Sequence, residues 1–276
     1  MKTRVTIDPI KEIKNITDWI KEYFINNGNA NTNAVIGISG GKDSTIAAAL
    51  LCKAIGRDHV IGVMMPQDTQ TDIDDSRRVC EYLGIHSIEI DIGPACRALY
   101  RSINESRDDA FDPIELNPGV ATNTPARIRM ATLYAIAAEV GGRVVNTCNW
   151  SEEYVGYSTK YGDAAGDFTI LGRYTVTEVL QIGDALGLPT DLVHKTPADG
   201  MCGKSDEDNL GFTYAELDDY IRNDASLEYD VFRRIKEKYE AAEHKRRAIQ
   251  LPGPRPKFIY VDEEGKVVRD DSDWEF

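Results

Sequence analysis

The chain has 276 residues, of which 42% are hydrophobic and 28% are charged, as in folded proteins with one large core. Its net charge of −14 argues against broad nucleic-acid binding, because such proteins present basic surface to the phosphate backbone. No apolar run is long enough to span a bilayer, and residues 1–15 lack the apolar core of a signal peptide, so we expect a cytoplasmic protein without a membrane partner. The five cysteines are widely spaced and include no CxxC pair, which indicates reduced thiols rather than disulfides or a zinc site.

The first part of the chain alternates between helical and extended patterns. Apolar residues recur at helical spacing in 10–24, and a short apolar run around Gly37 predicts the first strand. We place Pro125 at the first position of a helix and expect an exposed connection at 108–118 before it. The expected elements are a strand at 34–38, a helix at 45–55, a strand at 59–65, a helix at 71–83 capped by Thr71, a strand at 86–92, a helix from 123–126 to 140 and a strand at 143–147.

Strands that alternate with helices predict an α/β fold with a doubly wound parallel sheet and flanking helices. In such sheets the ligand lies at the carboxyl ends of the strands. Because no clean boundary interrupts the pattern, we expect one domain over residues 1–276. Beyond Trp150 we expect a loop at 154–172, helices near 176–186, 214–222 and 227–248, and a proline-rich tail at 251–256.

The most informative segment follows the first strand and reads Ser39-Gly40-Gly41-Lys42-Asp43-Ser44. A glycine-rich turn before a helix forms a phosphate cradle, because its backbone N–H groups are free and the helix dipole favours an anion. It differs from a Walker A loop, in which Ser or Thr directly follows Gly-Lys, because Asp43 separates Lys42 from Ser44. A carboxylate beside phosphates is repulsive unless a divalent cation bridges them, so we expect Asp43 to bind Mg²⁺ on a polyphosphate. The alternative is an ordinary glycine-rich turn.

Three later segments carry polar groups to the same rim. Thr147 and Glu152 follow the fourth strand, where Glu152 can add a second carboxylate to the Mg²⁺ site; a solvated loop acid is the alternative. Arg127 and Arg129 stand two apart on a helix, so one can reach a phosphate while the other packs or forms an ion pair. The loop at 157–167 combines charged residues and glycines, as ligand-binding loops and ordinary surface loops both do.

The loop at 39–44 resembles the SGGxDS pyrophosphate loop of the N-type ATP pyrophosphatases, which cleave ATP between its α and β phosphates. Together with later motifs, the chain resembles the NAD synthetases, whose fold is adenine nucleotide alpha hydrolase-like. These motifs occur in family order over nearly the whole chain: Asn123-Thr-Pro-Ala-Arg-Ile-Arg129, Thr147 to Glu152, Thr159-Lys-Tyr-Gly-Asp163, Asp167, Ser205-Asp-Glu207, Leu210-Gly211, Asp218-Asp-Tyr220 and His244-Lys-Arg246.

The resemblance implies a role for each matching residue. Asp43 and Glu152 would bind Mg²⁺ and, with Lys42, form the catalytic group. ATP would be bound by Ser39, Gly40, Gly41, Lys42, Asp43, Ser44, Thr147 and Thr196. Deamido-NAD (nicotinic acid adenine dinucleotide) would be bound by Arg127, Lys160, Asp167, His244 and Lys245.

The activity implied is that of an ammonia-dependent NAD synthetase, a ligase that forms a C–N bond. ATP with Mg²⁺ would convert the carboxylate of deamido-NAD to an adenylate, and ammonia would then give NAD, AMP and pyrophosphate. We expect no glutaminase domain, because the synthetase fills residues 1–276, so ammonia enters directly or comes from a separate partner. Family members are homodimers whose substrate site takes residues from both chains, so we expect a homodimer.

Two other functions stay open at this point. One is another amide-forming N-type ATP pyrophosphatase, such as a GMP synthetase subunit, and the other is a non-catalytic nucleotide-binding regulator on the same fold. The regulator draws support from two departures from the family pattern. Val176 stands where many relatives have a lysine, and Ala198 follows Pro197 where relatives have a hydroxyl residue, with Thr196 on the other side of that proline.

Overall fold

The computed structural model describes residues 6–70, 73–107, 111–194, 206–223, 226–247, 259–261, 264 and 267–270. The chain forms two compact units, residues 1–246 and 247–276. The second unit contains an antiparallel pair of strands, β6 (Ile259–Val261) and β7 (Val267–Asp270). The tail predicted at 251–256 and the cap predicted at Thr71 lie outside the described residues. None of the described helices has the length and apolar character needed to cross a membrane.

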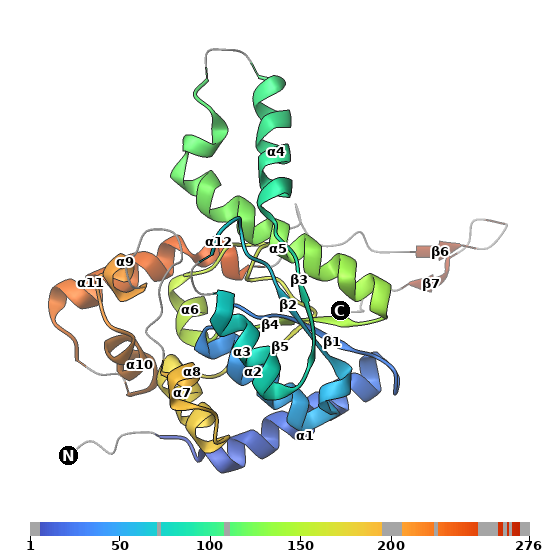
Figure 1. The fold of residues 1–276 in the computed structure, drawn as a ribbon, viewed down its shortest axis with the longest axis vertical. Coiled ribbons are helices and arrows are strands. Elements are labelled where there is room, and N and C mark those ends of the chain that lie inside the picture. Colours follow the sequence, from blue (N-terminus) through green and yellow to red (C-terminus); the bar gives the residue numbers. More distant parts are fainter. Residues whose placement is uncertain are drawn as a thin grey trace. The chain divides into compact units, whose positions relative to one another are not determined.

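A five-stranded, fully parallel sheet forms the centre of the first unit, in the order β3-β2-β1-β4-β5 (Figure 1). This confirms the predicted doubly wound α/β fold. The strand order reverses between β1 and β4, which is where open α/β sheets bind their ligands. The strands are β1 (Ala34–Gly37), β2 (Val60–Met64), β3 (His86–Glu89), β4 (Arg143–Asn146) and β5 (Phe168–Thr169).

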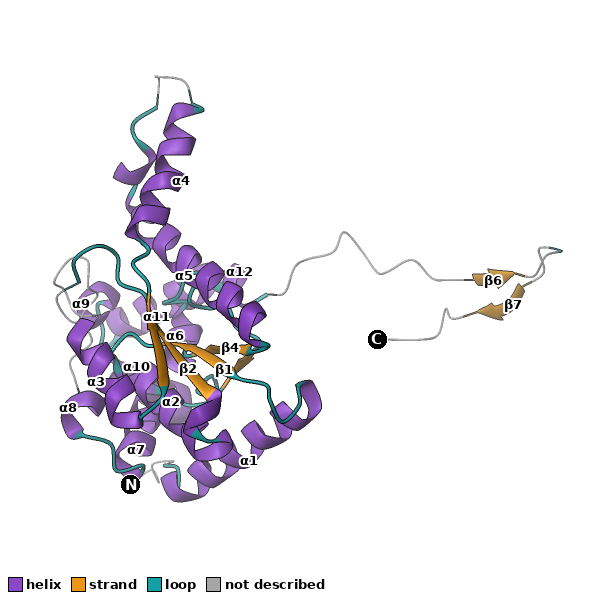
Figure 2. Ribbon diagram, turned by 45° about the vertical axis from the view of Figure 1, so that its right-hand side comes forward, coloured by secondary structure: helices purple, strands orange, loops and turns teal. Residues whose placement is uncertain are grey.

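Helices cover both faces of the sheet (Figure 2). Short 3-10 turns, η1 (Arg57–His59) and η2 (Ile114–Leu116), precede β2 and the long helix α5. The helices of the first unit are α1 (Pro9–Asn27), α2 (Lys42–Ile55), α3 (Ile73–Leu83), α4 (Gly93–Glu105), α5 (Pro118–Val140), α6 (Trp150–Val155), α7 (Val176–Ala185), α8 (Thr190–Val193), α9 (Asp206–Leu210), α10 (Tyr214–Asn223), α11 (Tyr229–Ala241) and α12 (Glu243–Arg246).

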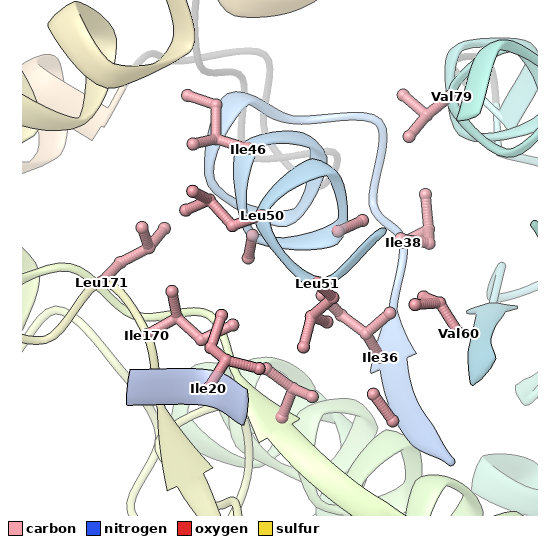
Figure 3. Packing of buried hydrophobic residues seen from close by; sticks show 14 of the residues in the cluster. Ile20, Ile36, Ile38, Ile46, Leu50, Leu51, Val60, Val79, Ile170 and Leu171 are labelled. Carbon is pink, nitrogen blue, oxygen red and sulfur yellow. The ribbon is translucent and has the colours of Figure 1, made fainter. Parts of the chain in front are cut away.

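Strand β1 lies between two hydrophobic cores, because successive side chains of a strand point to opposite faces. Ile36 packs with Ile20 of α1 and Leu50 of α2 in the larger core (Figure 3). Val35 faces the other core, which includes Ile136 of α5. All of these side chains except Ile136 are fully buried. The central strand is therefore completely buried on both faces, and residues 39–44, here called the phosphate loop, follow it directly.

The start of α5 differs from the prediction. Asn117 caps the helix by accepting hydrogen bonds from the backbone N–H groups of Gly119 and Val120, and Pro118 takes the first position. The prediction that Pro125 begins the helix was therefore wrong, since Pro125 lies within it and is buried. The actual start signal, Asn117 followed directly by Pro118, places its proline seven residues before Pro125.

Several short elements were not predicted from the sequence. Helix α4 follows β3, which ends at Glu89 instead of 92. Strand β5 falls within the segment expected to be a loop, and α6 begins four residues before that segment. The helix expected at 227–248 divides into α11 and α12. Helix α2 begins at Lys42, three residues before its expected start, so the charged residues of the phosphate loop belong to its first turn.

Candidate active site

The phosphate loop joins β1 to α2 in a tight turn that its own serines hold closed. The two hydroxyl oxygens of Ser39 and Ser44 lie 3.2 Å apart, and the backbone N–H of Ser39 donates to Ser44 Oγ at 3.3 Å. Gly40 has a φ of +75°, a conformation that favours glycine. Gly41 is the N-cap of α2 and makes no side-chain cap hydrogen bond. The free N–H groups of the first helical turn are therefore available to an anion.

The loop forms one wall of a cavity of about 810 Å³ at the carboxyl edge of the sheet. A volume in this range suits a nucleotide-sized ligand. A smaller cavity of about 220 Å³ adjoins it and shares several of its lining residues. The residues common to both are Ser39, Gly41, Asp43, Thr147, Glu152 and Asp163. Asp43 and Asn149 are 106 positions apart in the sequence but are in contact here, because β1 and β4 are neighbours in the sheet.

Two carboxylates and one ammonium group meet at this wall. Lys42 Nζ donates to Asp43 Oδ2 at 2.8 Å, and only 6% of the Lys42 side chain is exposed. Burial lowers the pKa of Lys42, but the carboxylates of Asp43 and Glu152 outweigh it and raise the pKa to about 12. Withdrawal from water, followed by repulsion from Asp43, raises the pKa of Glu152 to about 8. The ionisation of Glu152 is therefore opposed both by burial and by the neighbouring carboxylate of Asp43.

This donor set fits a magnesium ion. Oxygen ligands from one or two carboxylates, completed by substrate phosphates and water, are what Mg²⁺ takes in nucleotide sites. Asp43 and Glu152 line both cavities beside the phosphate loop, and a cation bound between them would relieve the repulsion from Asp43 that helps to raise the pKa of Glu152. No group of three or more His, Cys, Asp or Glu side chains suited to a metal occurs among the described residues. A metal bound to the protein here would therefore rely on phosphate oxygens.

Comparison with known proteins decides the family. Residues 12–249 match the family described as NAD synthase. The chain belongs to the NAD synthase family. It is 35% identical over 267 residues to the NH(3)-dependent NAD(+) synthetase of Pyrococcus furiosus, covering 91% of this chain and 97% of that protein, and 36% identical over 241 residues to that of Finegoldia magna, covering 86% and 93%. The solved structure of NMN synthetase from Francisella tularensis superposes with a TM-score of 0.80 at 30% identity, covering 90% of this chain and 99% of the other.

Four residues expected to bind the dinucleotide in this NAD synthase family member lie around one loop, residues 156–163. Arg127 Nε donates to the Lys160 carbonyl at 3.3 Å, and Lys160 Nζ donates to the His244 carbonyl. Lys245 Nζ donates to the carbonyls of Gly156 and Ser158 at 2.7 and 2.8 Å. None of these four lines either cavity. They form a connected group beside the nucleotide cavity rather than part of its wall.

Two other expected binding residues stand apart. Asp167 precedes β5 and accepts hydrogen bonds from the backbone N–H of Val144 at 2.7 Å and from the Tyr134 hydroxyl at 3.3 Å. It lines neither cavity, and its contacts hold β5 against β4. Thr196 lies outside the described residues. The sequence motif singled out Asp167 as a binding residue. It did not show that the Asp167 carboxylate connects the start of β5 to β4.

The cavity also has walls that the sequence analysis did not assign. The loop at 67–70 leaves the end of β2, and Asp206 begins α9. Arg129 lines the cavity, and its Nε donates to the Met65 carbonyl at 3.0 Å. Of the two arginines, Arg129 rather than Arg127 therefore faces the cavity. The position of β2 beside β1 is the signal that could have identified the 67–70 loop, because adjacent parallel strands end at the same edge.

Proposed function

We propose that this protein is an ammonia-dependent NAD synthetase, which amidates deamido-NAD at the expense of ATP and forms NAD, AMP and pyrophosphate. The carrying observation is Asp43, a carboxylate placed inside a phosphate-binding turn and opposed by a second carboxylate, Glu152, across the same cavity. Relatives named NH(3)-dependent NAD(+) synthetase support ammonia as the nitrogen donor.

The loop at 39–44 would hold the ATP phosphates through its backbone N–H groups and the N-terminus of α2. Asp43 and Glu152 would hold Mg²⁺, which when bound neutralises phosphate charge and favours departure of pyrophosphate. Lys42 adds a fixed positive charge at the same wall, because its raised pKa keeps it protonated at neutral pH. Thr147 lines both cavities together with Ser39, Asp43 and Glu152, which supports the proposal that it contacts ATP. The residues thus supply orientation and charge rather than a covalent nucleophile.

The dinucleotide would enter beside the 156–163 loop. Arg127, Lys160, His244 and Lys245 place positive or polar groups around this loop. Hydrogen bonds join the first three to one another and Lys245 to the carbonyls of the loop, which supports a common binding role. The pyrophosphate of deamido-NAD is an anion that such groups recognise. Asp167 would contribute from the β5 side. The negative net charge of the whole chain therefore coexists with a locally positive binding region.

A second candidate substrate is the nicotinate mononucleotide, because one solved structure that resembles this chain is an NMN synthetase. Amidation of the mononucleotide acid needs the same ATP chemistry and the same carboxylate. The mononucleotide differs from deamido-NAD only in lacking the adenylyl half. The side chains around the 156–163 loop would then have no adenylyl group to bind.

Product analysis tests the proposed function directly. Purified protein with ATP, Mg²⁺, deamido-NAD and ammonium is expected to release NAD and AMP in equal amounts, and little NAD when glutamine replaces ammonium. A parallel tube with nicotinate mononucleotide is expected to turn over more slowly. Faster conversion of the mononucleotide would reassign the substrate. AMP without an amide product would indicate a different acceptor, and ATP binding with no AMP under any condition would indicate a nucleotide-binding regulator.

A homodimer is proposed from exposed apolar side chains on α4 and in η2, the turn that leads into α5. Leu99 and Leu116 are 40% and 67% exposed, and α4 projects beside the start of α5 (Figure 1). Exposed large apolar side chains are common in protein interfaces. In the proposed homodimer, a second copy of the chain covers them symmetrically.

Light scattering on a sizing column tests the dimer. The chain is expected to elute at twice its 30.7 kDa mass, and the double variant Leu99→Asp, Leu116→Asp at the monomer mass, since charges on this surface oppose its burial. A parent protein that elutes as a monomer at micromolar concentration would contradict the proposal.

We also propose a cytoplasmic location, with which the unpaired state of Cys52, Cys80, Cys96 and Cys148 agrees.

A further inference from the structure

Asn149 joins β4 to α6, and its side chain is completely buried. It is the N-cap of α6, where its Oδ1 accepts a hydrogen bond from the backbone N–H of Glu152 at 3.0 Å. In return, the Asn149 backbone N–H donates to Glu152 Oε2 at 3.1 Å, which completes a capping box. The carboxylate of Glu152 is therefore held by the residue that begins its helix.

The opposite end of the same amide reaches the phosphate loop. Asn149 Nδ2 donates to Asp43 Oδ1 at 3.1 Å, while Lys42 Nζ donates to Asp43 Oδ2 at 2.8 Å. If the amide were turned over, Nδ2 would oppose the Glu152 N–H and Oδ1 would oppose the Asp43 carboxylate. Only one orientation of Asn149 satisfies both contacts, and in that orientation the side chain connects the two acids.

We propose that Asn149 is a positioning residue that fixes the carboxylates of Asp43 and Glu152 relative to each other for a divalent cation. The inference rests on the proposed function, in which these two acids hold Mg²⁺. Lys42 binds one oxygen of the Asp43 carboxylate and Asn149 binds the other, so the two donors together fix the rotation of that carboxylate. Partners behind metal ligands orient them, and loss of one typically lowers metal affinity or activity roughly 10–100-fold.

Asparagine is the N-cap residue whose chemistry meets both demands. Serine caps a helix equally well but is too short to replace the amide at Asp43. Aspartate also caps a helix but would place a third carboxylate against the first two. The site therefore requires an acceptor at one end of the side chain and a donor at the other, which the amide provides.

Two substitutions separate positioning from capping. Asn149→Ser keeps a side-chain oxygen for the Glu152 N–H and removes the group that contacts Asp43, whereas Asn149→Ala removes both. Asp8→Ala is the matched control, because Asp8 caps α1 through the N–H groups of Ile10 and Lys11, and α1 contributes no residue to the lining of either cavity. Two quantities are measured for each protein: the Mg²⁺ concentration for half-maximal NAD formation, and the rise in Tm when Mg²⁺ is added with α,β-methylene-ATP, an analogue that resists cleavage.

Both Asn149 variants are expected to need roughly 10–100-fold more Mg²⁺ than the parent, and to lose the Mg²⁺-dependent rise in Tm at the concentration that saturates the parent. Asp8→Ala is expected to respond to Mg²⁺ as the parent does, whatever its own Tm. A parent-like Mg²⁺ response in Asn149→Ser, with or without a defect in Asn149→Ala, would overturn the positioning role and leave only a helix cap. If the parent itself shows no Mg²⁺ response and forms no NAD, the proposed function fails and this inference fails with it.

Discussion

Replacement of Asp43 by alanine is expected to lower kcat/KM by roughly 10³-fold or more, with the fold retained. The carboxylate lies inside the turn at residues 39–44, where in the proposed reaction the charge that develops on pyrophosphate would be balanced by a cation that Asp43 helps to hold. Removal of the carboxylate also frees Lys42 from its nearest partner and leaves that ammonium group to Glu152. Initial rates of AMP release over a range of ATP concentrations, repeated at a series of Mg²⁺ concentrations, measure the effect.

Two companion variants make this result interpretable. Asp43→Asn preserves the volume of the side chain and removes its charge, so it is expected to be nearly as inactive as the alanine variant. Asp230→Ala removes an exposed acid whose pair with Arg233 spans 3.8 Å, and is expected to match the parent because exposed pairs contribute little. Near-parent activity of Asp43→Ala at high Mg²⁺ would remove this residue from the metal site.

Gly40→Ala is expected to reduce activity roughly 100-fold or more and to destabilise the fold. A φ of +75° costs an alanine about 1–2 kcal/mol in backbone strain alone. In addition, a Cβ at this position would lie 2.9 Å from the backbone nitrogen of Ser76 and 2.9 Å from the Cβ of Asp75, so the loop and α3 must separate. A displacement of about 1 Å in a group that positions substrate costs on the order of 10²-fold in rate.

Gly141→Ala is the control for the conformational part of this effect. Gly141 ends α5 with a φ of +63°, and no atom lies within 4 Å of the position its Cβ would take. Its substitution is expected to lower the free energy of unfolding by about 1 kcal/mol without changing kcat. Thermal unfolding and steady-state rates of the two variants give the comparison, and equal activity of both would show that α3 yields without moving the phosphate loop.

The sequence predicted the four longer strands and their parallel arrangement because extended apolar patterns alternate with helical patterns along the chain. It did not predict β5, since two residues are too few to show a period and Phe168 and Thr169 pair only in the context of β4. The start of α5 was misplaced because two Asn-Pro or Thr-Pro signals occur in the same helix and only the first is a cap. Short helices such as α6 depend on tertiary contacts rather than on propensity.

The candidate site could be predicted in outline for a similar reason. Once β1 and β4 are adjacent, the loop at 39–44 and Glu152 must meet at their carboxyl ends. What could not be predicted is the detail that depends on side-chain orientation. The sequence analysis assigned no role to Asn149, and only the fold shows that it caps α6 and that its amide also contacts Asp43. In the same way, Arg129 rather than Arg127 lines the cavity because of the rotation of α5 about its axis.

The double-sided burial of β1 has a consequence for the kinetics of the catalytic cycle. Both ends of the phosphate loop are anchored in segments that expose almost no surface, β1 on one side and the body of α2 on the other. Segments of this kind open only with the whole domain, whereas short peripheral helices open locally at much lower free energy. The loop is thus a fixed receptor for phosphate throughout turnover. Entry of ATP and escape of pyrophosphate must therefore be governed by the outer parts of the cavity, such as the loop at 67–70 and α9.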